Sequence, residues 1–173
     1  YHQDAKYIGL EPHNWVTAWV AITDANENNG CMRMWPGSHK NNLKHHNQKF
    51  DANNLLTRGQ TIENVPIKET EPVILKAGQM SLHHPTIVHG SGINKSNDRR
   101  IGFVVQSYIG DNVNQVLGKM FVQLARGKDR YKYHQYSNIP EEFMNIKDIE
   151  CRDIANEELS KIFYNGSKKI GKY

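Results

Sequence analysis

The first residues that could do chemistry are His2 and Asp4, which are separated by one residue. In a β-strand, residues i and i+2 point to the same side, so this imidazole and this carboxylate can aim at one point. Such a pair could hold two positions of a metal ion. The chain contains nine histidines, which generate chance pairs, and an exposed strand end explains the pair equally well.

His89 strengthens the metal interpretation through its surroundings, HGSGINKSNDRR (89–100). A second histidine from a distant strand would complete a set of two histidines and one carboxylate, which leaves open positions on a non-haem Fe(II) ion. Arg99 and Arg100 open the next predicted strand, and antiparallel pairing would bring an arginine close to the metal. Arginine grips carboxylates with two parallel hydrogen bonds. A surface charge pair is the alternative for these two arginines.

The elements expected to position these residues are short strands. Residues 14–24 are dense in β-branched and aromatic side chains, which indicates a buried strand. Residues 25–30 have turn composition and residues 31–35 alternate as a second strand, so the pattern predicts a hairpin over 14–35. Polar residues 40–70 predict a long loop, and loops of this length inside a domain are usually functional.

The second half of the pattern is similar. Residues 72–84 predict a strand, a turn at 76–78 and another strand, and 86–90 and 99–109 predict two more. A helix is predicted from Asn156 to Tyr164, with Asn156 as its N-cap and Gly166 as its stop. Many short strands followed by a helix favour a mainly β fold, an antiparallel sandwich or jelly roll.

Composition narrows the function classes. The 173 residues fit one domain, and no apolar run is long enough to span a bilayer. The net charge of +4 is mild and the basic residues form no stripe, which argues against nucleic-acid binding. No signal peptide is visible, and the isolated thiols Cys31 and Cys151 indicate a reducing cytoplasm. The oligomeric state is not predicted.

Four segments together resemble the phytanoyl-CoA dioxygenase family of Fe(II)- and 2-oxoglutarate-dependent oxygenases. In order along residues 1–109 they are YHQDAKY, VTAWVAITDANENNGCMRMWPGSHK, AGQMSLHH and HGSGINKSNDRRIG. The resemblance implies a double-stranded β-helix, a distorted cupin-like jelly roll, in a single oxygenase domain with its β core at about 1–109 and a C-terminal extension at about 110–173. Family members carry a substantial segment before this motif, so we expect the N-terminal part of the fold to be missing from this chain.

The resemblance also implies site residues, position by position. His2, Asp4 and His89 match the iron ligands, and Arg100 matches the residue that binds the distal carboxylate of 2-oxoglutarate. Ser91 and Trp19 match positions lining the same cosubstrate. Arg99 is expected to face away, because neighbouring strand residues alternate.

The implied reaction uses Fe(II), O2 and 2-oxoglutarate, with ascorbate as a supporting reductant. It hydroxylates a small-molecule substrate and releases succinate and CO2. Because Asp4 fills the carboxylate position that related halogenases leave to chloride, we expect hydroxylation. A catalytically inactive jelly-roll binding module is the competing hypothesis.

The substrate is the least defined part of the prediction. The family name suggests an acyl-CoA, but no coenzyme A site is apparent. The segments NLLTRGQ, SLHH, DRRIG and ARGKDRY resemble a branch of the family that acts on small polar molecules. We therefore expect a polar or anionic substrate, such as an aminophosphonate or an amino acid derivative. Its anion would be met by Arg58, Arg126 and Lys128, or these three are solvated surface charges.

The remaining histidines receive weaker assignments. One of His83 and His84 is expected to face the cavity, either as a substrate contact or as a structural histidine. His45 and His46 are expected to be solvated in the long loop.

Overall fold

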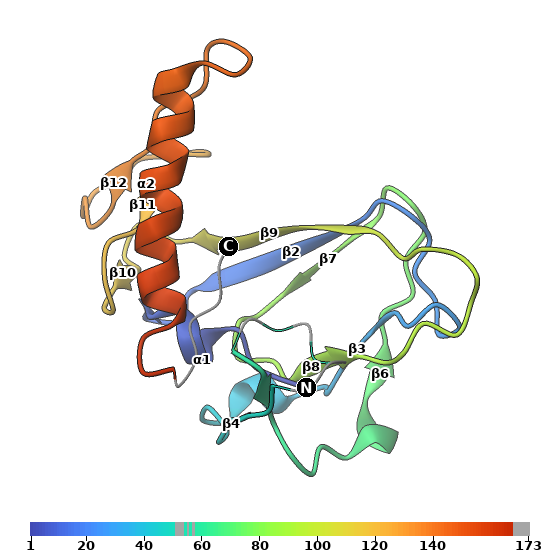
Figure 1. Cartoon of the computed structure of the whole chain (residues 1–173). Coiled ribbons are helices and arrows are strands. Elements are labelled where there is room, and N and C mark those ends of the chain that lie inside the picture. Colours follow the sequence, from blue (N-terminus) through green and yellow to red (C-terminus); the bar gives the residue numbers. More distant parts are fainter. Residues whose placement is uncertain (51–53, 55, 57, 168–173) are drawn as a thin grey trace. The chain divides into compact units, whose positions relative to one another are not determined.

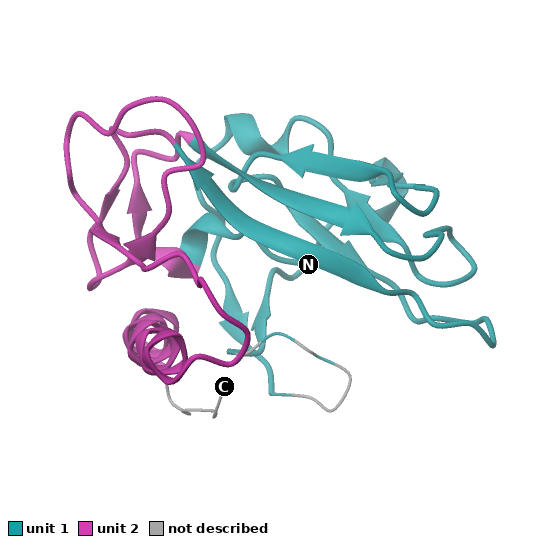
Figure 2. Cartoon of the chain, turned by 90° about the horizontal axis from the view of Figure 1, so that it is seen from above, with its two compact units in different colours: residues 1–6, 15–109 teal, residues 7–14, 110–173 magenta. Residues whose placement is uncertain are grey.

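The structure, a computed structural model, describes residues 1–50, 54, 56 and 58–167. It divides into two compact units (Figure 2). Unit 1 comprises residues 1–6 and 15–109, and unit 2 comprises residues 7–14 and 110–173. None of the described helices is long and apolar enough to cross a bilayer.

Unit 1 consists mainly of two antiparallel three-stranded sheets that face each other (Figure 1). One sheet has the strand order β7-β2-β9 and the other β6-β3-β8. Successive segments of the chain cross between the two sheets, which is the jelly-roll arrangement that was predicted. The strand bounds are β2 Trp15–Ala21, β3 Met32–Met34, β6 Glu71–Pro72, β7 Met80–His83, β8 His89–Ser91 and β9 Gly102–Ile109.

The central strand β2 presents alternate side chains to the space between the sheets, and Thr17 and Trp19 line that space. Trp19 is 7% exposed and lies directly over Gly102 at the start of β9. A Cβ atom at position 102 would overlap the indole ring, so only glycine allows this close approach. Trp19 is thereby fixed as part of the floor between the sheets.

The hairpin predicted over residues 14–35 is wrong. β2 pairs with β7 and β9, whereas β3 pairs with β6 and β8 in the opposite sheet. The intervening segment forms its own turn, in which the side chain of Asn26 accepts hydrogen bonds from the backbone N–H groups of Asn28 and Asn29. The inner faces of β2 and β3 then pack face to face, and they bury an apolar cluster. That cluster contains Trp19, Ala21, Ala25, Cys31 and Met32.

The 40–70 segment contains more regular structure than predicted. It includes a short antiparallel pair, β4 (Asn47–Gln48) with β5 (Gln60–Thr61), between the 3-10 helices η1 (Ser38–Lys40) and η2 (Ile67–Glu69). A backbone hydrogen bond extends the pair at one end, where the N–H of Lys49 donates to the carbonyl of Gly59 at 2.7 Å. The segment is therefore an ordered wall where it is described.

Unit 2 has two small strand pairs and a long helix. The helix α2 runs from Ile146 to Phe163, ten residues longer at its start than predicted, and it is capped by Asn145 rather than Asn156. The side chain of Asn145 accepts a hydrogen bond from the N–H of Lys147 at 2.9 Å, a normal N-cap. The first half of α2 is polar and mostly exposed, so its sequence lacks the apolar periodicity that would reveal it. The helix α1 (Ala5–Ile8) contains the point in the sequence at which unit 1 passes into unit 2. In unit 2, β1 (Leu10–Glu11) pairs with β10 (Asn114–Gln115), and β11 (Phe121–Val122) pairs with β12 (Gln135–Tyr136).

Candidate metal and cosubstrate site

The residues around the first histidine form a short extended stretch against β8. The N–H of His2 donates to the carbonyl of His89 at 2.9 Å, and the N–H of His89 donates to the carbonyl of His2 at 3.0 Å. This reciprocal pair places the two imidazole rings with centroids 4.2 Å apart, although the residues are far apart in the sequence. One local register therefore brings both histidines together.

Asp4 completes the cluster. Its Oδ1 lies 3.2 Å from Nε2 of His2 and 3.6 Å from Nε2 of His89, and its side chain is 8% exposed. One donor atom from each of the three side chains lies within 4.8 Å of the others. Of the described residues, only these three form a cluster able to hold a metal ion. Two imidazoles and one carboxylate, open on the cavity side, suit a non-haem iron ion.

The protonation states of these side chains also fit a metal ion. The pKa of His89 is lowered to about 3, by burial first and then by the neighbouring charge of His2, so the ring is neutral at ordinary pH. Its Nδ1 lies 3.1 Å from the carbonyl of Ile87, which fixes the tautomer and leaves Nε2 free for the site. Burial would raise the pKa of Asp4, but the imidazoles of His2 and His83 hold it well below its usual range.

Two residues of the β7-β2-β9 sheet support the carboxylate from behind. Thr17 Oγ1 donates a hydrogen bond to Asp4 Oδ2 at 2.8 Å, and His83 Nε2 lies 3.7 Å from the same oxygen. Thr17 and His83 face each other across β2 and β7. Oδ2 is thereby occupied, which leaves Oδ1 to face His2 and His89. Thr17 was missed in the sequence, although its place between Trp15 and Trp19 on the inward face of β2 was a signal.

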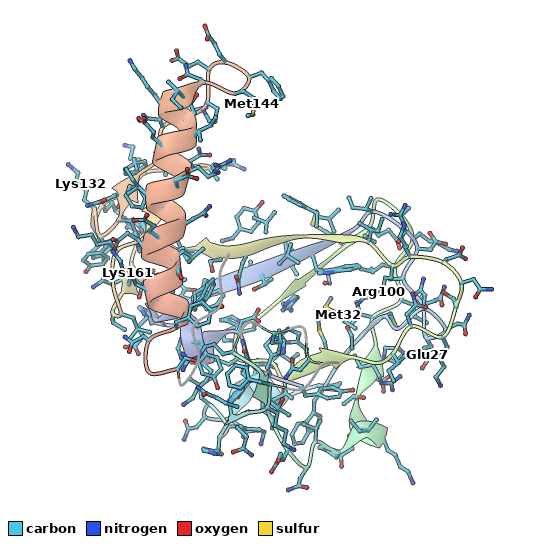
Figure 3. The ribbon with its side chains drawn as sticks, in the orientation of Figure 1. Glu27, Met32, Arg100, Lys132, Met144 and Lys161 are labelled. Atoms are coloured by element: carbon cyan, nitrogen blue, oxygen red, sulfur yellow. The ribbon has the colours of Figure 1, made fainter. Side chains whose placement is uncertain are left out.

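The cluster opens into a cavity of about 740 Å³ between the sheets. Arg100, Ser91 and Trp19 line it together with the metal cluster, so the structure brings all six predicted site residues to one cavity. In Figure 3, Arg100 and Met32 lie between the ribbons of β9 and β8. The remaining lining residues are Tyr1, Lys49, Asn54, Leu56, Gln60, Thr61, His83, Gly90, Gly92, Val104 and Gln106, together with Thr17.

Arg100 reaches the cavity by a different route from the one predicted. β8 and β9 are not paired, because each belongs to a different sheet, so the guanidinium crosses from the start of β9 toward β8. Its Nη2 donates to Ser91 Oγ at 3.4 Å and its Cζ lies 5.5 Å from the centroid of the Trp19 ring. It forms no ion pair with any residue that the structure describes, and partial burial lowers its pKa. Arg99 lies in a different hollow, with Thr23 and Asp24.

The other predicted cationic and histidine positions are scattered. Arg58 is 6% exposed and is not among the described residues that line the cavity. Arg126 and Lys128 are exposed residues of unit 2. Of the histidine pair, His83 lines the cavity, whereas Nδ1 of His84 lies 2.7 Å from Thr86 Oγ1.

The prediction that His46 is solvated is wrong. His46 is 7% exposed, and its ring contacts the backbone of Gln3, the residue between the two candidate ligands of the first motif. Nothing in the local sequence around His46 signals this contact, because its partner is 43 residues away.

Comparison with known proteins identifies the family to which the chain belongs. A sequence profile of the phytanoyl-CoA dioxygenase (PhyH) family matches residues 1–102, more than half of the chain. The chain belongs to the phytanoyl-CoA dioxygenase family. Peroxisomal phytanoyl-CoA dioxygenase from Homo sapiens is 33% identical over 103 residues, which are 57% of this chain and 30% of the human protein.

Two further proteins extend the family comparison. A probable alpha-ketoglutarate-dependent hypophosphite dioxygenase from Stutzerimonas stutzeri is 28% identical over 120 residues, 68% of this chain and 42% of that protein. The solved apo structure of the non-heme monooxygenase ThoJ superposes with a TM-score of 0.81 at 29% identity, and the match covers 95% of this chain and 59% of that chain. The chain therefore shares its fold with a non-heme oxygenase and spans about a third of the length of the curated phytanoyl-CoA dioxygenases.

The hydrogen bond from Thr17 to Asp4 gives a first prediction. Replacing Thr17 by Val keeps the shape and the β-branched stiffness but removes the hydroxyl group. We expect metal affinity to fall by roughly tenfold or more, as when other outer partners of metal ligands are lost. Titration calorimetry with Co(II) measures this, and Thr23→Val, which removes a hydroxyl group away from the cluster, serves as the control. Equal affinity of Thr17→Val and the unmodified protein would contradict this role.

The buried histidines predict the pH dependence of stability. The pKa of His46 is lowered to about 4, chiefly by burial, and that of His89 to about 3. When unfolded, both titrate near pH 6.5. Between these values the unfolded chain binds more protons than the folded one, so the free energy of unfolding falls as pH falls from 6.5 toward 4. Thermal denaturation of the metal-free protein across this range checks the slope, which His46→Gln should flatten and His45→Ala should not.

Proposed function

We propose that this chain carries the iron and 2-oxoglutarate site of a dioxygenase that hydroxylates a small polar or anionic molecule, with release of succinate and CO2. The observation that carries the proposal is one cavity that holds both the His2–Asp4–His89 cluster and Arg100, which forms no ion pair with any residue that the structure describes. Family membership supports the same chemistry. A non-catalytic binding module would not need a buried, oriented carboxylate between two imidazoles.

In this proposal the protein holds the metal ion and orients the cosubstrate and the substrate. The metal supplies the redox chemistry. Fe(II), when bound, would activate O2 together with 2-oxoglutarate for the hydroxylation of a C–H bond. His2 and His89 offer Nε2 atoms and Asp4 offers Oδ1. The hydroxyl group of Thr17 keeps the second carboxylate oxygen occupied, so that the ligand set stays on one side and the cavity side stays open.

Charge balance in the cavity favours a dicarboxylate cosubstrate. A divalent ion and the carboxylate of Asp4 leave one net positive charge, and Arg100, which lines the same cavity, adds a second. A dianion such as 2-oxoglutarate neutralises both charges. The Arg100 guanidinium can bind the distal carboxylate in a bidentate manner, while Ser91 and Trp19 flank it.

The wall of the cavity that the 40–70 segment supplies favours a polar substrate. Lys49, Asn54, Gln60 and Thr61 come from the 40–70 segment and line the cavity with groups that form hydrogen bonds. Lys49 forms an ion pair with Glu63 at 2.6 Å, and with the amide and hydroxyl groups around it this wall suits the polar end of an aminophosphonate or an amino acid derivative. The resemblance to a hypophosphite dioxygenase supports a phosphorus oxyanion among the candidates. The resemblance to phytanoyl-CoA dioxygenases supports the alternative, an acyl-CoA substrate.

Arg100 provides the test of cosubstrate binding. Arg100→Ala should raise the dissociation constant of 2-oxoglutarate by about one to two orders of magnitude, because a hydrogen bond to a charged group contributes roughly 1.5–3 kcal/mol. The adjacent Arg99→Ala is the matched control, and it should change the constant little. Calorimetric titration of the Co(II)-loaded protein measures both. Equal effects of the two substitutions would show that the wrong arginine has been assigned.

The substrate class is tested by product analysis. With Fe(II), ascorbate and 2-oxoglutarate, we expect succinate release coupled to the gain of one oxygen atom by small aminophosphonates or amino acids, as measured by mass spectrometry. Long-chain acyl-CoA should give no oxygenated product. Turnover of acyl-CoA alone would establish the alternative substrate, and failure of any added compound to accelerate succinate release would favour a binding module.

A further inference from the structure

Gln3 occupies the position between the two candidate ligands His2 and Asp4, and it is completely buried. Its side-chain amide Nε2 donates to the carbonyl of Thr86 at 2.6 Å, and its Oε1 accepts from the N–H of Lys44 at 2.8 Å. A buried polar side chain with both ends satisfied is expensive to disturb. The middle of the metal-binding motif is therefore tied to the 40–70 segment.

The imidazole of His46 makes a second tie, to the backbone of Gln3. The Gln3 N–H donates to His46 Nε2 at 3.0 Å, so that nitrogen carries no proton. The proton must then sit on Nδ1, which lies 2.9 Å from the carbonyl of Lys44 and donates to it. The ring is thus a neutral bridge with one defined tautomer.

The backbone of residues Tyr1–Gln3 forms hydrogen bonds on both of its edges, and successive residues alternate between the two edges as in a β-strand. His2 bonds to His89 on one edge, whereas the carbonyl of Tyr1 and the N–H of Gln3 point to the other edge. There the carbonyl of Tyr1 accepts from the N–H of Ile62 at 2.7 Å. The ring nitrogen of His46 takes the place that a carbonyl of a neighbouring strand would fill.

We propose that His46 is a positioning residue that couples the cavity wall to the metal ligands. The wall residues Lys49 and Gln60 are flanked by His46 and Ile62, which both bond to the backbone of the metal motif. An ordered wall therefore holds His2 and Asp4 in place. A metal ion bound to these ligands stabilises the wall by the same free energy, because coupling between two sites is reciprocal. The inference rests on the proposed metal site.

The test compares variants that differ in one acceptor atom. His46→Ala should weaken Co(II) binding by roughly tenfold, in the range found for other outer partners of metal sites. His46→Gln, whose side-chain oxygen can reach the Gln3 N–H, should restore most of the affinity, whereas the isosterically similar but apolar His46→Leu should not. His45→Ala removes an exposed neighbouring imidazole and should bind like the unmodified protein.

A second readout follows the wall directly. In the unmodified protein, Co(II) should increase the hydrogen-exchange protection of the backbone amides at 44–49 and 58–62, and His46→Ala should lose this increase. This measurement remains informative even where a variant fails to fold, because the Co(II)-dependent increase in protection is measured on the unmodified protein. Lack of Co(II) binding by the unmodified protein would overturn the metal site itself. Normal binding without added protection, or equal affinity of His46→Ala, would overturn the coupling alone.

Discussion

The reciprocal pair of backbone hydrogen bonds between His2 and His89 is the constraint on which the rest of the site depends. A strand register is set in steps of one residue, and a slip of one would turn every side chain to the opposite face. Here the register directs His2, Asp4 and His89 toward the cavity and Gln3 into the protein. The same register therefore determines both the burial of Gln3 and the position of the three candidate metal ligands.

Electrostatics then determines how a buried carboxylate can exist at this point. Asp4 is nearly inaccessible, and an isolated buried charge would be costly. The cost is offset by the hydroxyl group of Thr17 and by three imidazoles around the carboxylate, those of His2, His83 and His89. This arrangement keeps the carboxylate ionised while burial keeps His89 neutral, which is the combination that a divalent cation requires.

The sequence was informative where a short-range pattern controls the outcome. The i, i+2 spacing of His2 and Asp4 predicted a shared direction. Arg100 lines the cavity and Arg99 lies in a separate hollow, although both precede β9 and strand alternation therefore does not explain the difference. The hairpin over 14–35 failed because apolar inner faces do not distinguish edge-to-edge pairing from face-to-face packing. His46 could not be assigned, since its burial depends on Gln3, far away in the chain.

The crossing of Arg100 from one sheet to Ser91 on the other has a consequence for selectivity. The candidate ligand His89 lies on β8, whereas Arg100 precedes β9 by two residues and its guanidinium lies over Trp19. A diacid held at both ends would run from the candidate metal ligands to the guanidinium beside Ser91, so the position of that guanidinium would set the length of carbon chain that fits. Discrimination against shorter and longer diacids would then depend on the contact between Trp19 and Gly102 that fixes the ring under the guanidinium, and not on the arginine alone.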